Sequence, residues 1–465
     1  MNKSLKSLLM FFLALCVVSG LWAGGGQPGG ASSGSGGIQK TLKIVGCGPF
    51  ATTGLNGTID AISGRDIPGY KMIVDEWKRL QPDVSPVIEA YPWDNWQAAI
   101  QTAVLAGGVD VIMHGATLTD LAVPLNDRVK GDAAWASKRL SYATRRADVL
   151  GPLNNSYITG IPVAIAPMVV LLNKDILAHY NVKLPDANWT WDELLAIAKA
   201  TTGTDPVTKE KTYGFQFHMS YSNNEIWKNF VNIGYGLGAV PLVQYGANAK
   251  STKVTYNDAN AMKIWDFVAE LSKYTSPSDR EGIDVSVPQG DLDIAIYFSE
   301  DAILTHDNLK AAGVLDKYAV QSLPRVNSGE LRGDITPYLG DFNLAICKTS
   351  TQQDLAWEWI KFSTTNEVAI RYYTQAGRPP NHRDYYSNIN QLVSQSWVDA
   401  IGRGIAKIPD TYSPASGLYS NNISFGNLNA TIGQGIRMLL MGTGSAKDAA
   451  DSVQKMVDEY KATLK

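Results

Sequence analysis

The segment PWDNWQ combines two tryptophans with planar polar side chains. An aromatic ring can stack on the apolar C–H face of a sugar, while Asp94 and Asn95 could pair with its hydroxyls. Asp94 can also cap a helix whose third residue is Gln97, and Trp96 then joins an apolar stripe along that helix. We therefore expect Trp96 to pack in the core and Trp93, at the end of the preceding strand, to face a ligand.

Further residues with the same chemistry occur in turns and at the expected ends of other strands. The candidate aromatic platforms are Phe50, Trp227, Tyr235, Phe298 and Phe342, and the candidate polar or close-contact partners are Thr52, Gly115, Thr117, Glu300, Asp301, Asp341 and Arg378. The guanidinium of Arg378 offers a bidentate fork that a lysine lacks. Two structural alternatives stay open, because Trp227 could be buried in its own helix and Arg378 could pair with a carboxylate.

Catalytic and metal-binding patterns are not evident. The chain contains no HExxH, Walker loop or CxxC pattern, and its five histidines lack metal-ligand spacing. Adjacency does not bring the side chains of His306 and Asp307 together in a helix, so a structural or ligand-contact histidine is expected there. We therefore expect no catalytic residues, no metal and no cofactor.

The N-terminus has the organisation of an export signal. Lys3 and Lys6 precede an apolar run over residues 8–22, which ends in small residues. We expect a signal peptide over residues 1–23 and a flexible linker over residues 24–38, where Gly and Ser dominate. Lipidation of Cys16 is the less favoured alternative, because a leucine stands where a small residue is usual.

Length and composition narrow the class of protein. The chain has 465 residues and a formal charge of -3, so nothing recruits nucleic acid or an anionic membrane. About 430 residues remain after the leader, enough for two domains with a cleft between them. Outside the leader only Cys47 and Cys347 remain, which excludes a disulfide framework and leaves one bridge open. No second apolar run could span a membrane, so an exported, soluble monomer is expected.

The first half of the chain alternates strands and amphipathic helices. Strands are expected over residues 41–47, 84–91 and 109–113, with a helix ending before Pro82 between the first two and the Trp96 helix between the last two. This βαβαβ pattern is typical of a parallel sheet. The loops over residues 48–53, 93–95 and 114–117 should then meet at its carboxyl edge, where such sheets bind ligands.

A second α/β unit is expected to follow Pro162. Its strands are expected at 168–172, 213–218, 292–298 and 318–323, and its helices at about 223–233 and 259–273. Thr190 should cap another helix, with Glu193 completing a capping box. Residues 341–347 read as a strand before a helix containing Trp357 and Trp359, and the last hundred residues are mostly helical.

Several segments, in this order, resemble family 1 extracellular solute-binding proteins of sugar ABC importers. They are VDEW before Pro82, WDNWQ, DVIM at residues 110–113, LLNKD, WTWDEL, GDFNLAI and GRPP at residues 377–380. The resemblance covers nearly the whole mature chain. Asp341-Phe342 stands where the family often has Gly-Trp, and Ser299-Glu300-Asp301 where it has a turn containing Trp, so substrate identity should not be copied from a relative.

The resemblance implies a two-lobed α/β fold of the periplasmic-binding-protein type, with a mixed, mostly parallel sheet in each lobe. Three crossings, expected near residues 155, 299 and 348, would divide the chain into an N-lobe (39–155 and 300–347) and a C-lobe (156–299 and 348–465). The implied function is capture of a mono- or oligosaccharide in the cleft and its delivery to the ABC permease subunits, without enzymatic chemistry.

Two other functions remain open. A polyamine-binding protein would need several carboxylates around aromatic walls, which Asp94, Glu300, Asp301 and Asp341 could supply. An exported glycoside hydrolase would need two carboxylates across a cleft, and the 44 acidic residues of the chain make some such pair unavoidable.

Overall fold

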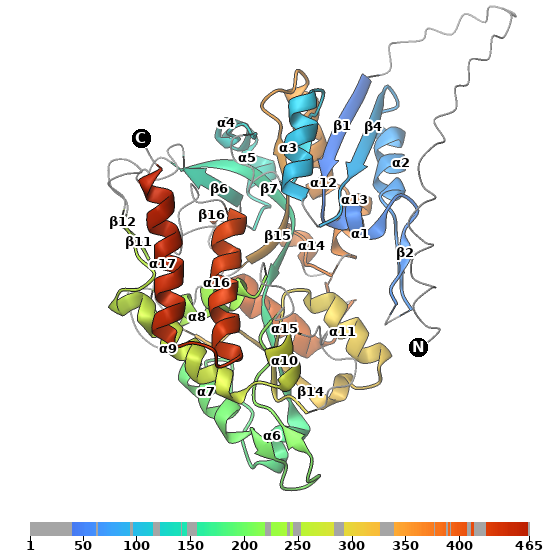
Figure 1. The fold of residues 1–465 in the computed structure, drawn as a ribbon. Helices are drawn as coiled ribbons and strands as arrows, with labels where there is room; N and C mark the ends of the chain where they lie inside the picture. The colour runs from blue at the N-terminus through green and yellow to red at the C-terminus, as the bar shows by residue number, and fades with distance from the viewer. Residues whose placement is uncertain are drawn as a thin grey trace, which may run out of the picture. The chain divides into compact units, whose positions relative to one another are not determined.

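The computed structural model describes most of residues 40–463 (Figure 1). The described residues are 40–61, 64–93, 96–114, 121–140, 142–146, 156–218, 225–239, 242–244, 253–282, 293–325, 339–375, 377–386, 389–390, 392–406, 411–412 and 425–463. The expected signal peptide and linker lie outside them.

Seven strands form one mixed sheet in the order β16-β6-β7-β15-β5-β1-β4. Their bounds are β1 Lys40–Gly46, β4 Val84–Ala90, β5 Val111–Met113, β6 Tyr142–Arg146, β7 Ser156–Pro167, β15 Leu339–Ile346 and β16 Thr411–Tyr412. Strand β1 pairs in parallel with β4 and β5, through crossover helices α2 (Lys71–Leu80) and α3 (Trp96–Ala106). The predicted βαβαβ unit is therefore confirmed.

The remaining pairs in this large sheet are mostly antiparallel. Strand β15 runs antiparallel to β5 and β7, and β6 runs antiparallel to β7, while β16 is parallel to β6. The buried strand positions Leu42, Ile44 and Leu344 belong to the core of this sheet. Five helices pack against this core. They are α1 (Pro49–Thr53), α4 (Asn126–Gly131), α5 (Ala133–Ala136), α12 (Gln353–Thr365) and α13 (Glu367–Thr374).

A smaller sheet has the order β13-β8-β14, with bounds Ile296–Ser299, Val169–Asn173 and Tyr318–Ser322. Both neighbours run antiparallel to β8, unlike the mostly parallel pairing expected for the second lobe. Strand β8 follows β7 directly along the chain. Strands β13 and β14 are joined by helix α11 (Ala302–Ala311) and run in the same direction as each other, opposite to β8. The expected strand over residues 213–218 appears as isolated parallel bridges, two of them to the β13 segment.

Helices pack with the small sheet in two buried apolar clusters. Their bounds are α6 Lys174–His179, α7 Trp191–Ala200, α8 Trp227–Gly236, α9 Ala259–Leu271, α10 Pro277–Glu281, α15 Gln395–Ala406, α16 Phe425–Leu440 and α17 Ala446–Ala462. Helix α7 has the predicted capping box, in which Thr190 accepts from the Glu193 backbone and Glu193 accepts from the Thr190 backbone. Helices α16 and α17 lie side by side (Figure 1).

Short elements complete the described fold. They are helix α14 (Arg383–Tyr386), the 3-10 turns Ser272–Tyr274 and Leu315–Lys317, and the two-stranded ribbons β2–β3 (Thr58–Ile59, Asp66–Ile67), β9–β10 (Gly203–Thr204, Lys211–Thr212) and β11–β12 (Val243–Gln244, Lys253–Val254). Cys47 and Cys347 are buried free thiols, so the bridge left open by the sequence is not formed. Within the described residues, no helix is long and apolar enough to cross a bilayer.

Packing groups the chain differently from the expected lobe boundaries. The chain leaves the large sheet at Met168 rather than near residue 155, and residues 300–325 surround the small sheet through α11 and β14. Helices α12 and α13 pack in the apolar cluster of the large sheet, where the ring centroids of Trp359 and Trp77 are 5.1 Å apart. An apolar stripe shows that a helix face is buried, but it does not show against which sheet.

Candidate functional site

Trp93 and His114 follow the carboxyl ends of β4 and β5, the two strands that flank β1. Their ring centroids are 5.3 Å apart. Trp93 is 49% exposed, whereas His114 is buried. The predicted convergence of loops at this edge therefore holds for these two residues, and a half-exposed indole packs against a buried imidazole.

Three more groups enclose the His114 ring. Trp96 and Phe342 lie 5.6 Å and 5.7 Å from it, the second edge-on at 79°. Gly48 closes another side, because a Cβ there would lie 3.1 Å from His114 Nε2. Gly48 also has a φ of 83°, which glycine adopts without strain.

His114 is uncharged at neutral pH. Burial lowers the pKa of His114 to about 3, and the positive charges of Arg378 and Lys228 act in the same direction. The aromatic wall of the site therefore contains a neutral imidazole.

Phe342 joins this wall to a buried ionic network. The Arg378 guanidinium carbon lies 4.1 Å from the Phe342 ring centroid, a cation–π contact. Arg378 is 8% exposed, its Nε donates to Asp301 Oδ1 at 2.8 Å, and its Nη2 lies 3.5 Å from Glu300 Oε1. Of the two roles that the sequence left open for Arg378, the structure displays carboxylate pairing.

Lys228 completes the network from the first turn of α8. Its Nζ donates to both carboxylate oxygens of Glu300, at 2.9 Å and 3.0 Å, and lies 2.6 Å from Glu225 Oε2. Burial raises the pKa of Glu300, but Lys228, His218 and Arg378 together hold that pKa well below its usual range. Glu300 is therefore an ionised carboxylate that is already matched by buried cations.

The Arg378 loop is hydrogen-bonded to the large sheet and to helix α11. The Ile165 amide of β7 donates to Pro379 O at 2.8 Å, and the Ile303 amide of α11 donates to Gly377 O at 3.2 Å. Gly377 has a φ of 104° and lies against Leu304. The loop thus fixes Arg378 between the large sheet and the helix that follows Asp301.

Five other predicted site residues are buried in the core, packed against it, or exposed away from the contacts described above. Phe50 is fully buried and packs 6.2 Å from both Tyr372 and Tyr373, so it presents no surface to a solute. Phe298 and Trp227 are buried in the core of the small sheet, and Tyr235 packs against that core. Thr52 is exposed and its hydroxyl donates to Gly48 O. At Phe50, Phe298, Trp227 and Tyr235, therefore, the aromatic side chain packs in or against the core.

Other predicted residues cannot be placed. Asp94, Asn95, Gly115 and Thr117 lie outside the described residues, as does the side chain of Asp341. Trp93, Glu300, Asp301, Phe342 and Arg378 are the predicted residues that the structure brings together.

His114, His218 and Lys228 were not predicted as site residues. His114 was inside one of the expected edge loops but was not singled out. Lys228 carried a usable signal, because it interrupts the apolar residues Ile226, Trp227 and Phe230 on one helix. A lysine in such a position is buried only when it has a partner.

His306 and Asp307 are in contact, contrary to the argument from sequence adjacency. His306 Nδ1 lies 3.2 Å from Asp307 Oδ1, while the Ser394 amide donates to His306 Nε2 at 3.2 Å. The ring also packs edge-on against Trp397, with centroids 5.4 Å apart. The Nε2 bond and the Trp397 contact hold α11 to the start of α15, while Nδ1 contacts Asp307 within α11, so His306 has a structural role.

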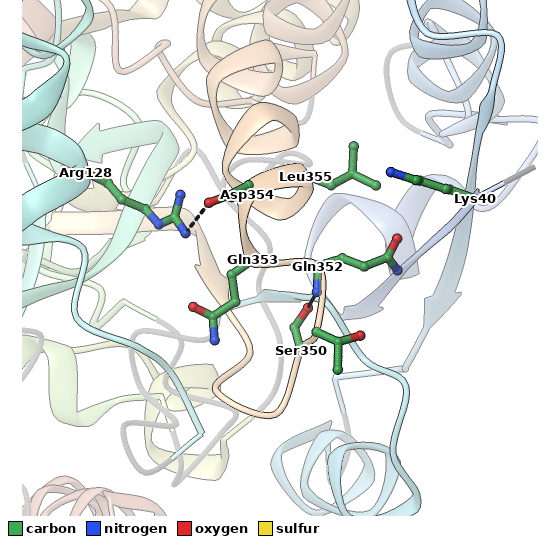
Figure 2. A pocket seen from close by; sticks show the side chains of 8 residues that line it. Lys40, Arg128, Ser350, Gln352, Gln353, Asp354 and Leu355 are labelled. Atoms are coloured by element: carbon green, nitrogen blue, oxygen red, sulfur yellow. Dashed lines mark hydrogen bonds and ion pairs between the residues drawn. The ribbon is translucent and has the colours of Figure 1, made fainter.

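A polar hollow of about 480 Å³ lies at the opposite, amino edge of the large sheet, around the loop before α12 (Figure 2). Figure 2 shows Lys40, Gln352 and Leu355 around it, with Arg128 paired to Asp354 at 2.8 Å. Ser350 at its base donates to Asp110 at 2.6 Å. The hollow lacks an aromatic wall, so we do not assign the site to it. Across the described ranges, no cluster of three or more His, Cys, Asp or Glu could hold a metal ion.

An α/β chain with two sheets and an aromatic wall at the strand ends has the organisation of a solute-binding protein. A family model described as bacterial extracellular solute-binding protein matches residues 63–370. The chain belongs to this family.

Individual relatives agree with this assignment. A Brucella abortus (strain 2308) protein named as a binding protein is 22% identical over 383 residues, 77% of this chain and 85% of that protein. The structure of an ABC substrate-binding protein from Listeria monocytogenes in complex with cycloalternan has a TM-score of 0.62 at 14% identity, covering 90% of this chain and 99% of that one. An ABC transporter solute-binding protein from Agrobacterium vitis S4 with bound D-mannitol has a TM-score of 0.61 at 16% identity, covering 91% and 99%. These structures establish the two-lobed binding-protein fold.

Proposed function

We propose that this protein is the exported substrate-binding component of an ABC importer, and that it delivers a neutral, polyhydroxylated solute such as a mono- or oligosaccharide to a membrane permease. The observation that carries the proposal is the site at the strand ends, where an exposed aromatic face adjoins polar groups that are already paired. Sugar recognition needs this combination of a stacking surface and fixed hydrogen-bonding groups. The cycloalternan and D-mannitol held by two proteins of the same fold support this class of ligand.

Charge pairing argues against the polyamine alternative. A polyamine site needs carboxylates whose charge is available to the ligand. Here Glu300 is matched by Lys228, and Asp301 accepts from Arg378. A cationic solute would have to break these buried ion pairs, and the binding free energy lost in doing so is not lost for a neutral solute.

The same pairing argues against a glycoside hydrolase. That reaction needs one carboxylic acid with a raised pKa, which can protonate the leaving group. The pKa of Glu300 is instead held well below its usual range. We therefore propose that the protein binds and releases its solute without chemistry.

We further propose revised lobe boundaries, based on packing. One lobe would comprise residues 40–167, 339–375 and β16, and the other residues 168–325 together with α15, α16 and α17. The Arg378 loop would then be one of the connections between lobes.

Mass spectrometry of ligand retained through native purification tests the function most directly. Calorimetric titration with cycloalternan, maltotetraose, D-mannitol and spermidine then ranks the ligand classes. We expect a carbohydrate or polyol to bind and spermidine not to bind. Tighter binding of spermidine would establish the polyamine alternative, and hydrolysis of the oligosaccharides during the titration would establish the enzyme.

Export is tested separately. We propose cleavage near Gly24, no lipid on Cys16 and a monomeric mature protein. Intact mass from the native host should begin near Gly24, and light scattering should give the mass of one chain. A diacylated Cys16 would instead mean that the protein is anchored to a membrane.

A further inference from the structure

His114 adopts a backbone conformation that is uncommon for a residue with a side chain. Its φ is 62°, a left-handed value, and its amide donates to Asn343 O at 2.7 Å. Strained residues of this kind persist where the surrounding structure imposes them, and they cluster at functional sites. The bond to β15 holds the His114 backbone at the end of β5.

The imidazole is the common neighbour of the rings in the site. Trp93, Trp96 and Phe342 all lie within 5.3 to 5.7 Å of it, as centroid distances. Of these three, Trp93 is the exposed one, whereas Phe342 is buried and Trp96 is half-buried against the core. The indole of Trp93 packs directly against the imidazole, with 5.3 Å between the ring centroids, so the imidazole can hold the indole in place.

We propose that His114 is a positioning residue, which holds the Trp93 indole as the solute platform and does so as an uncharged ring. This inference rests on the proposed function, since a platform has a role only where a solute stacks on it. His114 itself is buried and packs against Trp93, so it acts through the indole.

Charge near the ring explains why it must stay neutral. Two charged groups that act on it are Arg378, from the loop after α13, and Lys228, from α8, and both are cations. Proton uptake would place a third cation in this buried region, where burial and the charges of Arg378 and Lys228 all oppose it.

Indole ¹⁵N–¹H NMR of the ligand-free protein tests the contact without any ligand. Trp93→Phe identifies the Trp93 signal. His114→Asn keeps a residue type that tolerates positive φ but removes the ring, and His382→Asn is the matched control, a buried histidine elsewhere. We expect His114→Asn to shift the Trp93 signal and lower its heteronuclear NOE, and His382→Asn to leave both unchanged. An unchanged Trp93 signal in His114→Asn overturns the inference.

A pH titration of the unmodified protein tests the neutral ring and needs no variant to fold. We expect the Trp93 indole signal to stay constant from pH 8 to pH 5. Movement with a midpoint near 6.5, the ordinary histidine value, would show a ring that takes up a proton and would overturn the inference.

A double-mutant cycle with cycloalternan links the contact to binding. Trp93→Ala and His114→Asn should each weaken affinity, and the double variant should be no weaker than Trp93→Ala alone. Additive losses would mean that His114 acts other than through Trp93, which overturns the inference. Unchanged affinity in Trp93→Ala would contradict the proposed site and, with it, the platform role of Trp93. The NMR experiment would still show whether His114 contacts Trp93, so the two failures can be distinguished.

Discussion

Two tryptophans three positions apart have different surroundings in this protein. Trp93 is 49% exposed beside His114, whereas Trp96 packs against the apolar cluster that contains Ile100 and Val104. Trp93→Ala should cost solute affinity, about 1 to 3 kcal/mol, with little loss of fold stability. Trp96→Ala should cost about 3 kcal/mol of stability, the lower end for tryptophan truncations, because the ring is only half-buried. Calorimetric titration and thermal melts on both variants separate these roles, and equal losses of stability would contradict them.

Two carboxylates on the same lysine also differ in their environment. Glu300 is buried with Lys228, whereas the Glu225 side chain is 41% exposed. Glu300→Gln leaves a buried cation short of its partner and should cost about 3 to 5 kcal/mol of unfolding free energy. Glu225→Gln, the matched control, should cost less than about 1 kcal/mol. Denaturant unfolding measures both, and similar costs would mean that burial does not strengthen the Glu300 pair.

Acid should destabilise the protein through its buried histidines. Burial lowers the pKa of His114 to about 3 and that of His382 to about 4. Between those values and about 6.5 the unfolded chain binds protons that the folded chain does not, so stability falls as pH falls through this window. Each histidine lowers the free energy of unfolding by at most about 1.4 kcal/mol per pH unit in this window. Denaturant unfolding from pH 7 to pH 4 should show a shallower loss in His114→Asn, and an unchanged slope would mean that His114 is protonated in the fold.

At the scale of elements, a local capping signal was sufficient to predict where a helix begins. The Thr190 hydroxyl accepts from the Glu193 amide, and Glu193 Oε2 accepts from the Thr190 amide at 2.7 Å, so both donors at the start of α7 are satisfied. Thr190→Ala should cost about 1 kcal/mol of unfolding free energy, while Thr190→Ser should restore most of it. Equal stability of the two variants would indicate that the hydroxyl is dispensable.

Pairing between elements was harder to predict than the elements themselves. The parallel arrangement of β1, β4 and β5 follows from short crossovers through α2 and α3, which the sequence displays as consecutive units. The antiparallel arrangement around β8 arises because β7 and β8 are continuous across Met168 while β13 lies more than a hundred residues further along the chain. No local pattern distinguishes such a strand from one in a parallel sheet.

At the scale of the whole molecule, a two-lobed binding protein should close on its solute. The Arg378 loop, which is bonded to Ile165 of β7 and Ile303 of α11, would lie near the hinge. Small-angle scattering should show a smaller radius of gyration when a saturating carbohydrate is added, and no change with spermidine. An unchanged radius with a bound carbohydrate, in a protein shown to be open when empty, would contradict closure.

The sequence by itself determined the class of fold, the family and much of the local structure. Helix caps, apolar stripes and the order of strands depend on residues a few positions apart, so they can be read without knowing the fold. The same reasoning selected Trp93, Glu300, Asp301, Phe342 and Arg378 as candidates, because aromatic and charged residues in loops and near strands are visible in sequence.

Only the tertiary structure decided which partners these residues have. It paired Glu300 with Lys228, 72 positions away, and directed the Arg378 fork to Asp301 and Glu300. It also buried Phe50 and Phe298 in the core and packed His114 against Trp93. A charged residue or an apolar face in the sequence indicates that a partner is needed. Which residue becomes that partner depends on how distant strands pair, and that is a property of the folded chain.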